Sequence, residues 1–128
     1  MSARSRKTPV REALIEGSFL QADVTDGLGS IKTADKDCFA SNIRTDFADS
    51  VDVDASFKPG HERDPRWDYL VGHRSSRAVI AVEPHPAKES EIDVIIEKRA
   101  WTRAKLKDHL EAGARISQWL WVASGRSQ

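Results

Sequence analysis

Apolar and polar residues change their period along this chain, and the changes predict which segments are strands and which are helices. Residues 50–57 alternate between apolar and polar side chains, as expected of a half-buried strand. Residues 66–72 and 78–83 are rich in strand-favouring side chains and flank a short polar turn, which predicts an antiparallel hairpin. The run from Ala78 to Val82 is apolar throughout, as in a strand that is covered on both faces.

Helical spacing occurs in two other segments. Phe39, Ile43 and Phe47 fall four residues apart, which predicts a helix over 33–48. A longer apolar stripe predicts a second helix over 90–111. The members of this stripe are Ile92, Ile95, Ile96, Ala100, Leu106 and Leu110.

A last apolar segment, residues 115–123, predicts a strand after the long helix. Together these elements predict an α+β fold, in which a mixed central sheet is flanked by helices and one β-hairpin carries an acidic cluster. The 128 residues correspond to one domain, and no shift in composition suggests a second. Residues 1–8 are polar and basic, and we expect them to form a disordered arm.

Composition and charge restrict the classes of function. The chain has 20 Lys and Arg residues and 20 Asp and Glu residues, so its formal net charge is zero. Because basic residues do not outnumber acidic ones, tight non-specific binding of duplex DNA is disfavoured. The zero net charge does not exclude a basic face on one side of the molecule. Cys38 is the only cysteine, which excludes an intrachain disulfide and a zinc site made of thiolates. No apolar run approaches roughly 18 residues and no secretory signal is recognisable, so we expect a cytoplasmic protein without a membrane partner.

The most concentrated chemistry lies on the predicted hairpin. Asp68 interrupts an otherwise apolar strand, and Glu83 ends the next strand. Carboxylates inside strands are costly unless they are paired, hydrogen-bonded or bound to a cation. With Asp54 from the preceding strand, they could bind Mg²⁺ or Mn²⁺, and a metal there would polarise a phosphodiester. The structural alternative is that Asp68 pairs with Arg66 or Arg77 and that Glu83 caps the following helix.

Four basic or titratable residues follow Glu83 and extend this candidate site. His85 lies two positions after Glu83, so both side chains point to one face, where His85 would act as a general base or an extra ligand. Lys88 would stabilise a transition-state charge if its loop folds back, and Arg99 and Arg103 would do so from the long helix. The alternatives are a loop histidine bonded to backbone, a solvated lysine, and arginines that extend out of the helix interface.

The order of these elements and residues is similar to the PD-(D/E)XK nuclease-like, or restriction-endonuclease-like, core. That core runs α-β-β-β-α-β, and the match would begin with the helix over 33–48 and end with the strand over 115–123. The resemblance implies that Asp68 and Glu83 bind a divalent ion. In that family a lysine two residues after the glutamate assists catalysis, whereas here His85 occupies that position.

The chain also resembles a bacterial protein family with no known reaction. The shared patterns are Ser-Val-Asp-x-Asp at 50–54, Arg-Trp-Asp-Tyr at 66–69, Val-Glu-x-His-x-Ala at 82–87, and a helix that carries Lys98 and Trp101. Two functions follow as hypotheses: a metal-dependent phosphodiesterase or nuclease-like enzyme acting on nucleic acid, or a catalytically silent binding or accessory module with a nucleic-acid or protein partner. The sequence indicates neither the substrate nor the oligomeric state.

Overall fold

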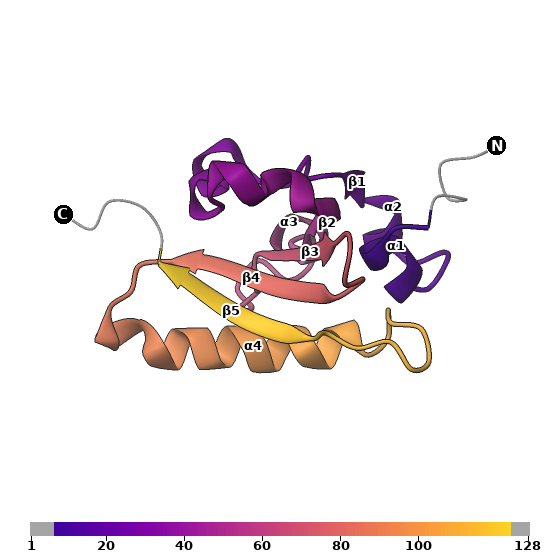
Figure 1. Ribbon diagram of the computed structural model, residues 1–128. Helices are drawn as coiled ribbons and strands as arrows, with labels where there is room; N and C mark the ends of the chain where they lie inside the picture. The colour runs from indigo at the N-terminus through magenta and orange to yellow at the C-terminus, as the bar shows by residue number, and fades with distance from the viewer. Residues whose placement is uncertain (1–6, 124–128) are drawn as a thin grey trace.

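The computed structural model describes residues 7–123 and is built around a five-stranded sheet (Figure 1). Its strands are β1 (Thr25–Asp26), β2 (Phe47–Asp52), β3 (Tyr69–His73), β4 (Val79–His85) and β5 (Gln118–Ala123), and they lie in that order. Neighbours from β1 to β4 are antiparallel, whereas β5 runs parallel to β4. The fold is therefore α+β with a mixed sheet, as the sequence predicts. Residues 1–6, most of the predicted arm, lie outside the described residues.

Helices and turns cover both faces of this sheet. The α-helices are α1 (Pro9–Ala13), α2 (Phe19–Ala22), α3 (Val53–Phe57) and α4 (Ile92–Leu106). Short 3-10 helices occur at Thr33–Cys38, Ser41–Asp46 and Glu89–Glu91. Figure 1 shows α4 along one face beside β5, with the segment that holds the first two 3-10 helices on the opposite side.

The alternation of side chains along the strands divides the core in two. Leu70 and Ala81 belong to the first apolar cluster, which also contains residues of α1, α2, α3 and α4. Tyr69, Val71 and Val82 belong to the second cluster, which the segment around Phe39 and Phe47 covers. Because successive side chains of a strand point to opposite faces, Glu83 lies on the same face as Ala81, towards α4.

The predicted hairpin is confirmed. Tyr69 pairs with Val82 and Gly72 with Val79, in antiparallel register. The long helix and the last strand are also present, although α4 ends at Leu106 rather than near residue 111. β4 continues through Pro84 to His85. Pairing with β3 ends at Val82, so beyond that residue β3 offers no backbone carbonyl to bond, and a proline without an N–H group can lie in β4.

The helix predicted over 33–48 is wrong. The segment forms two 3-10 helices, and its last residues already belong to β2. Phe39 and Phe47 are buried and make an edge-to-face contact with their ring centroids 5.3 Å apart, but Ile43 is exposed. The spacing of four therefore comes from two separate contacts with the sheet and not from one helical face.

The strand predicted over 50–57 is correct only for its first three residues, because it ends at Asp52 and α3 follows. The Asp52 side chain accepts the backbone N–H of Ala55 at 2.8 Å and caps α3, and burial raises the pKa of this carboxyl group. The backbone N–H groups of Val53 and Asp54 donate to the carbonyl of Asp68, at 2.8 and 3.2 Å. These bonds fix Asp68 against the start of α3.

A buried carboxylate that the sequence does not single out holds α1 on the sheet. Asp49 in β2 is fully buried and accepts the N–H groups of Val10 and Arg11 at 3.1 and 3.0 Å. Gly72 of β3 lies beneath this contact, and a Cβ atom there would lie 2.2 Å from Asp49 Oδ1. Within residues 7–123, no helix combines the length and the apolar character that crossing a bilayer requires.

Candidate functional site

Glu83 is the centre of the candidate site and has no exposed surface. It lies near the end of β4, opposite the segment that leads into β3 and beside Trp121 of β5. Its Oε1 atom accepts the backbone N–H of Asp68 at 2.9 Å. The carboxylate therefore projects inward from the sheet and does not cap the following helix, so that structural alternative is wrong.

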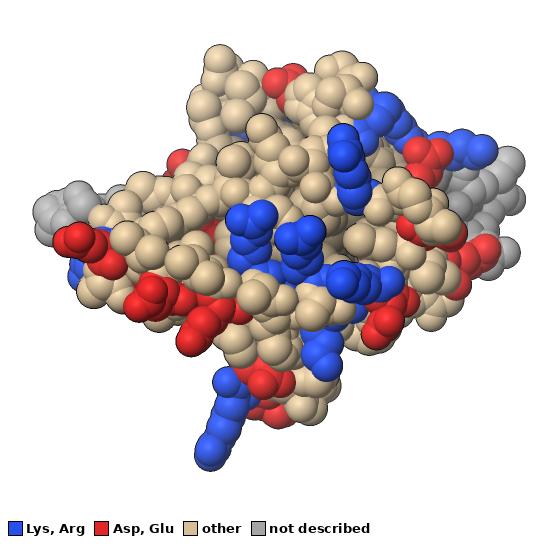
Figure 2. Space-filling model, turned by 90° about the horizontal axis from the view of Figure 1, so that it is seen from below, with Lys and Arg blue, Asp and Glu red and all other residues tan. Residues whose placement is uncertain are grey.

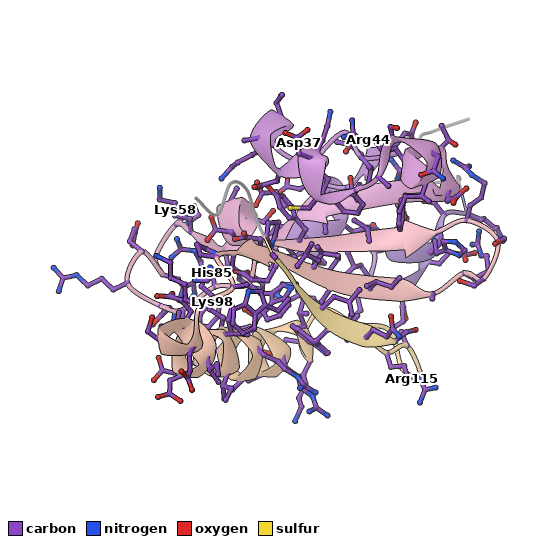
Figure 3. The ribbon with its side chains drawn as sticks, turned by 60° about the vertical axis from the view of Figure 1, so that its left-hand side comes forward. Asp37, Arg44, Lys58, His85, Lys98 and Arg115 are labelled. Atoms are coloured by element: carbon purple, nitrogen blue, oxygen red, sulfur yellow. The ribbon has the colours of Figure 1, made fainter. Side chains whose placement is uncertain are left out.

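The second oxygen of Glu83 faces two cationic or titratable groups. Lys98 of α4 places Nζ 2.5 Å from Glu83 Oε2, and His85 Nδ1 lies 3.3 Å from the same atom. Figure 3 shows His85 and Lys98 together in the space between α4 and the sheet. A buried carboxylate needs such partners, because its charge has lost its hydration. Asp68, Glu83, His85, Glu91 and Lys98 are called the Glu83 site below.

Lys98 is a member of this site that the sequence indicates only through a resemblance, as a residue of the helix after the hairpin. The buried residues of α4 are Ile95, Thr102 and Leu106. Lys98 lies three residues after Ile95 and four before Thr102, so it shares the face that meets the sheet. A lysine on the buried stripe of a helix, opposite a strand glutamate, is the signal that could have revealed the pair.

His85 lies between two carboxylates. While Nδ1 approaches Glu83, Nε2 lies 2.7 Å from Glu91 Oε1, and the backbone carbonyl of His85 accepts the indole N–H of Trp121 at 3.0 Å. Both ring nitrogens therefore have partners. This arrangement suits a residue that positions Glu83 better than it suits a base that receives a proton from substrate.

Asp68 is half-buried just before β3, and its carboxylate forms no hydrogen bond or ion pair with any residue from 7 to 123. Burial and the negative charge of Glu83 raise the pKa of Asp68 to about 7, against the opposing effect of Lys98. Burial also raises the pKa of Glu83, and the hydrogen bond from Lys98 opposes that change. Two adjacent carboxyl groups with raised pKa values indicate a site that an added cation would stabilise.

The expected partners of Asp68 are engaged elsewhere. Arg66 donates through Nε to Asp54 Oδ1 at 2.9 Å, and Arg77 pairs with Glu12. Asp54 belongs to α3 and not to a strand, and its charge contributes to the raised pKa of Asp68. Asp54 therefore acts on the site at a distance, while Arg66 holds its carboxylate.

The structure does not bring the other predicted residues to the Glu83 site. Lys88 is exposed and precedes the 3-10 helix Glu89–Glu91. Arg99 lies over the ring of Trp119, at 5.9 Å from its centroid, and Arg103 lines a groove beside β5. Neither arginine forms an ion pair with a carboxylate of the described chain.

The donors at the Glu83 site partly fit a divalent metal. No group of three His, Cys, Asp or Glu side chains in the described part of the chain is arranged to hold a metal ion. Mg²⁺ is nevertheless commonly held by one or two carboxylates, with water and substrate phosphate as its remaining ligands. Asp68, with its unpartnered carboxylate, and Glu83 are the residues that would hold such an ion.

Comparisons with known proteins identified no relative of this chain. A scan against protein-family models, a search of curated proteins and a search of solved structures each gave no match.

Proposed function

We propose that this protein is a metal-dependent phosphodiesterase of the PD-(D/E)XK nuclease-like kind, which acts on nucleic acid. One observation carries the proposal: Asp68, Glu83 and Lys98 meet from the segment before β3, from β4 and from α4. Lys98 Nζ is 2.5 Å from one Glu83 oxygen, and the backbone of Asp68 is bonded to the other oxygen. An aspartate, a glutamate and a lysine are the residue types that the motif of that family combines.

The order of the elements supports the same proposal. β2, β3 and β4 form an antiparallel meander, and α4 then connects β4 to the parallel strand β5. The order is the same as in the β-β-β-α-β part of the restriction-endonuclease-like core, which supports the proposal. The single helix predicted over 33–48 is absent, but α1 precedes the meander and packs against β2 and β3.

Each residue then has a defined role. Asp68 and Glu83 would hold Mg²⁺ or Mn²⁺, which polarises the phosphodiester and acidifies a bound water when present. Lys98 replaces the lysine that the motif places where His85 stands, and its ammonium group stabilises negative charge beside Glu83. His85, held by Glu91, orients the Glu83 carboxylate.

A specific observation favours a second candidate, the silent binding module. Glu83 is completely buried and both of its oxygens already have partners, as in an ion pair that only stabilises the fold. In that case Lys98 would stay bonded to Glu83 and the protein would bind no metal there.

Thermal melts with Mn²⁺ or Mg²⁺ separate the two candidates. We expect either ion to raise the melting temperature of the wild type, by an amount that corresponds to about 2.7 kcal/mol at a hundredfold excess over Kd. The increase should vanish in Asp68→Asn and in Glu83→Gln. Asp46→Asn is a matched control, because Asp46 is exposed and lies outside the Glu83 site.

Cleavage of labelled DNA and RNA in the presence of Mn²⁺ completes the test. We expect Asp68→Asn to abolish cleavage and Lys98→Met to slow it by about a hundredfold or more. An absent metal shift together with absent cleavage would contradict the enzyme and support the silent module. A shift without cleavage would support a metal-binding module and would contradict the phosphodiesterase.

A further inference from the structure

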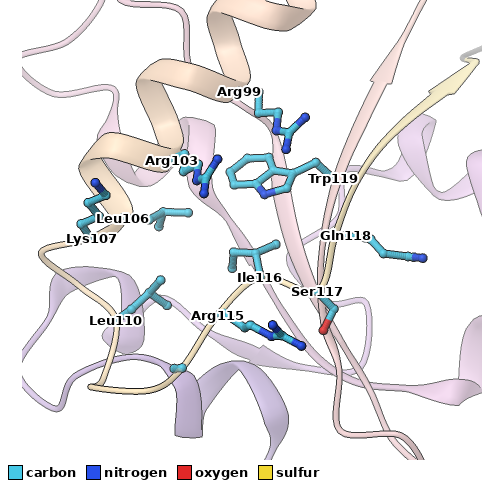
Figure 4. Close-up of a pocket in the computed structure, with 11 residues that line it drawn as sticks. Arg99, Arg103, Leu106, Lys107, Leu110, Arg115, Ile116, Ser117, Gln118 and Trp119 are labelled. Atoms are coloured by element: carbon cyan, nitrogen blue, oxygen red, sulfur yellow. The ribbon is translucent and has the colours of Figure 1, made fainter.

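A groove lies on the α4 side of the molecule, between the second half of that helix and the start of β5. Its volume is about 430 Å³, and four basic residues line it: Arg99, Arg103, Lys107 and Arg115. These residues and the hollow between them are called the basic groove below. Figure 4 shows Arg99 and Arg103 extending from α4 towards Trp119, with Arg115 beyond Ile116.

The positive charge of the basic groove is not neutralised locally. None of its four basic side chains forms an ion pair with a carboxylate among residues 7–123. The chain as a whole has as many acidic as basic residues, so this gathering of cations is a local feature. Figure 2, viewed from the α4 side, shows Lys and Arg side chains together on this face and acidic side chains towards its edges. Such a surface attracts a polyanion.

One cation of the groove is held in position by aromatic packing. Arg99 lies 5.9 Å from the ring centroid of Trp119, close enough for a cation–π contact. Trp119 in turn packs edge-to-face on the buried Trp67, with ring centroids 5.1 Å apart. The Arg99 guanidinium is therefore oriented before any ligand binds, which lowers the entropic cost of binding.

The size and the lining of the groove favour a single strand over a duplex. A hollow of about 430 Å³ can accept a nucleotide unit but not a double helix. Between the cations, the groove is lined by the half-buried side chains of Leu110, Ile116 and Trp119. Apolar and aromatic side chains contact the faces of bases only when those bases are unpaired, whereas a duplex presents phosphates and groove edges.

We infer that the basic groove binds the sugar–phosphate backbone of a single-stranded nucleic acid, with an unpaired base against its apolar lining. The inference rests on the proposed function for the identity of the ligand, because it names the substrate class of the same enzyme. α4 connects the two places: Lys98 contacts Glu83, and the next residue, Arg99, lines the groove. A strand held in the groove thus lies against the helix that supplies Lys98.

Fluorescence anisotropy with a labelled oligothymidylate, in EDTA and low salt, tests this inference. We expect the wild type to bind the oligonucleotide, and we expect the double variant Arg103→Glu, Lys107→Glu to bind at least about tenfold more weakly. The slope of log Kd against log salt should fall by about 0.7 for each phosphate contact that is lost. Both positions are exposed, so the variant should fold, and its melting temperature verifies this. The double variant Lys58→Glu, Arg63→Glu is the matched charge reversal, since both residues are exposed and lie outside the groove.

Competitors distinguish the ligand classes. A duplex of the same length, or inorganic polyphosphate at equal charge, should displace the labelled strand less effectively than unlabelled oligothymidylate does. Equal displacement by either competitor would overturn the assignment to a single strand, and unchanged binding by the double variant would overturn the site. The measurement needs neither metal nor turnover and can be repeated in Asp68→Asn. Failure of the phosphodiesterase proposal, seen as no metal shift and no cleavage, is therefore recognised separately from failure of the groove.

Discussion

The carboxyl group of Asp68 links the charge of the candidate site to the stability of the fold. Its pKa is raised from 3.8 to about 7 in the folded protein, chiefly by burial and by Glu83. In the unfolded chain the pKa returns to about 3.9. Between about pH 4 and 7 the folded protein therefore binds more protons than the unfolded chain, and the free energy of unfolding falls as the pH rises through this window.

Asp68→Asn removes this unfavourable contribution. In EDTA, we expect the variant to gain stability relative to wild type as the pH is raised from 5 to 8. Urea unfolding at the two pH values measures the change, with Asp46→Asn as the control. A stability difference between variant and wild type that is the same at both pH values would contradict the raised pKa of Asp68.

Gly72 provides a second test at the level of single residues. A Cβ atom there would lie 2.2 Å from Asp49 Oδ1 and 2.8 Å from Pro9 Cβ, and both atoms belong to the contact that holds α1. We expect Gly72→Ala to lower the free energy of unfolding by about 1 to 3 kcal/mol, because α1 must shift to admit the methyl group. Urea unfolding measures the loss. Ser75→Ala, in the exposed turn that follows, should leave stability nearly unchanged.

At the scale of elements, the contact between α4 and the sheet depends on a buried charge pair. Lys98 of α4 meets Glu83 of β4, and Thr102 accepts the backbone N–H of Trp67 at 2.8 Å one turn later. Lys98→Met leaves Glu83 buried without its cation, and we expect a loss of about 3 to 5 kcal/mol in the free energy of unfolding.

A double-mutant cycle with Glu83→Gln isolates the pair from the packing around it. In the Glu83→Gln background, the Lys98→Met change should cost much less, because no buried negative charge remains. Additive losses from the two single changes would show that Lys98 stabilises α4 through its methylene groups rather than through its charge.

The elements that the sequence predicts correctly are those with a strong local pattern. The apolar run of β4, the strand-favouring residues of β3 and the turn between them identify the hairpin. The helical spacing of the Ile-rich stripe identifies α4, but the stripe itself is not the buried face, because Ile92 and Ile96 are exposed and only Ile95 and Leu106 of it are buried within α4. The helix predicted over 33–48 fails because Phe39 and Phe47 reach the same face of the sheet from separate 3-10 turns. The strand over 50–57 is cut short because Asp52 caps a helix and Asp68 accepts its first N–H groups, and alternation alone does not contain that information.

At the scale of the whole molecule, the residue types of the Glu83 site are recognisable in the sequence, but their partners are not. Asp68 and Glu83 are adjacent because the hairpin register places them opposite each other. Lys98 reaches Glu83 only because α4 packs against the sheet, and the carboxylate of Asp54 is held in an ion pair with Arg66 instead. The basic groove is likewise invisible in a net charge of zero, because it depends on which side of α4 meets the start of β5.

The crossover through α4 also sets an order of assembly while the chain is being synthesised. Domains form from the N-terminal side as they leave the ribosome, and antiparallel strands joined by short turns close readily. β3 and β4, which a short turn joins, can therefore pair before α4 and β5 have emerged, but Glu83 at that stage has no ammonium partner and must stay hydrated. Lys98 arrives 15 residues later in the chain, and β5 can join β4 only after the whole helix has been made. A nascent chain that ends within the helix consequently has a partial sheet and an incomplete Glu83 site, because both Lys98 and β5 are needed to finish it.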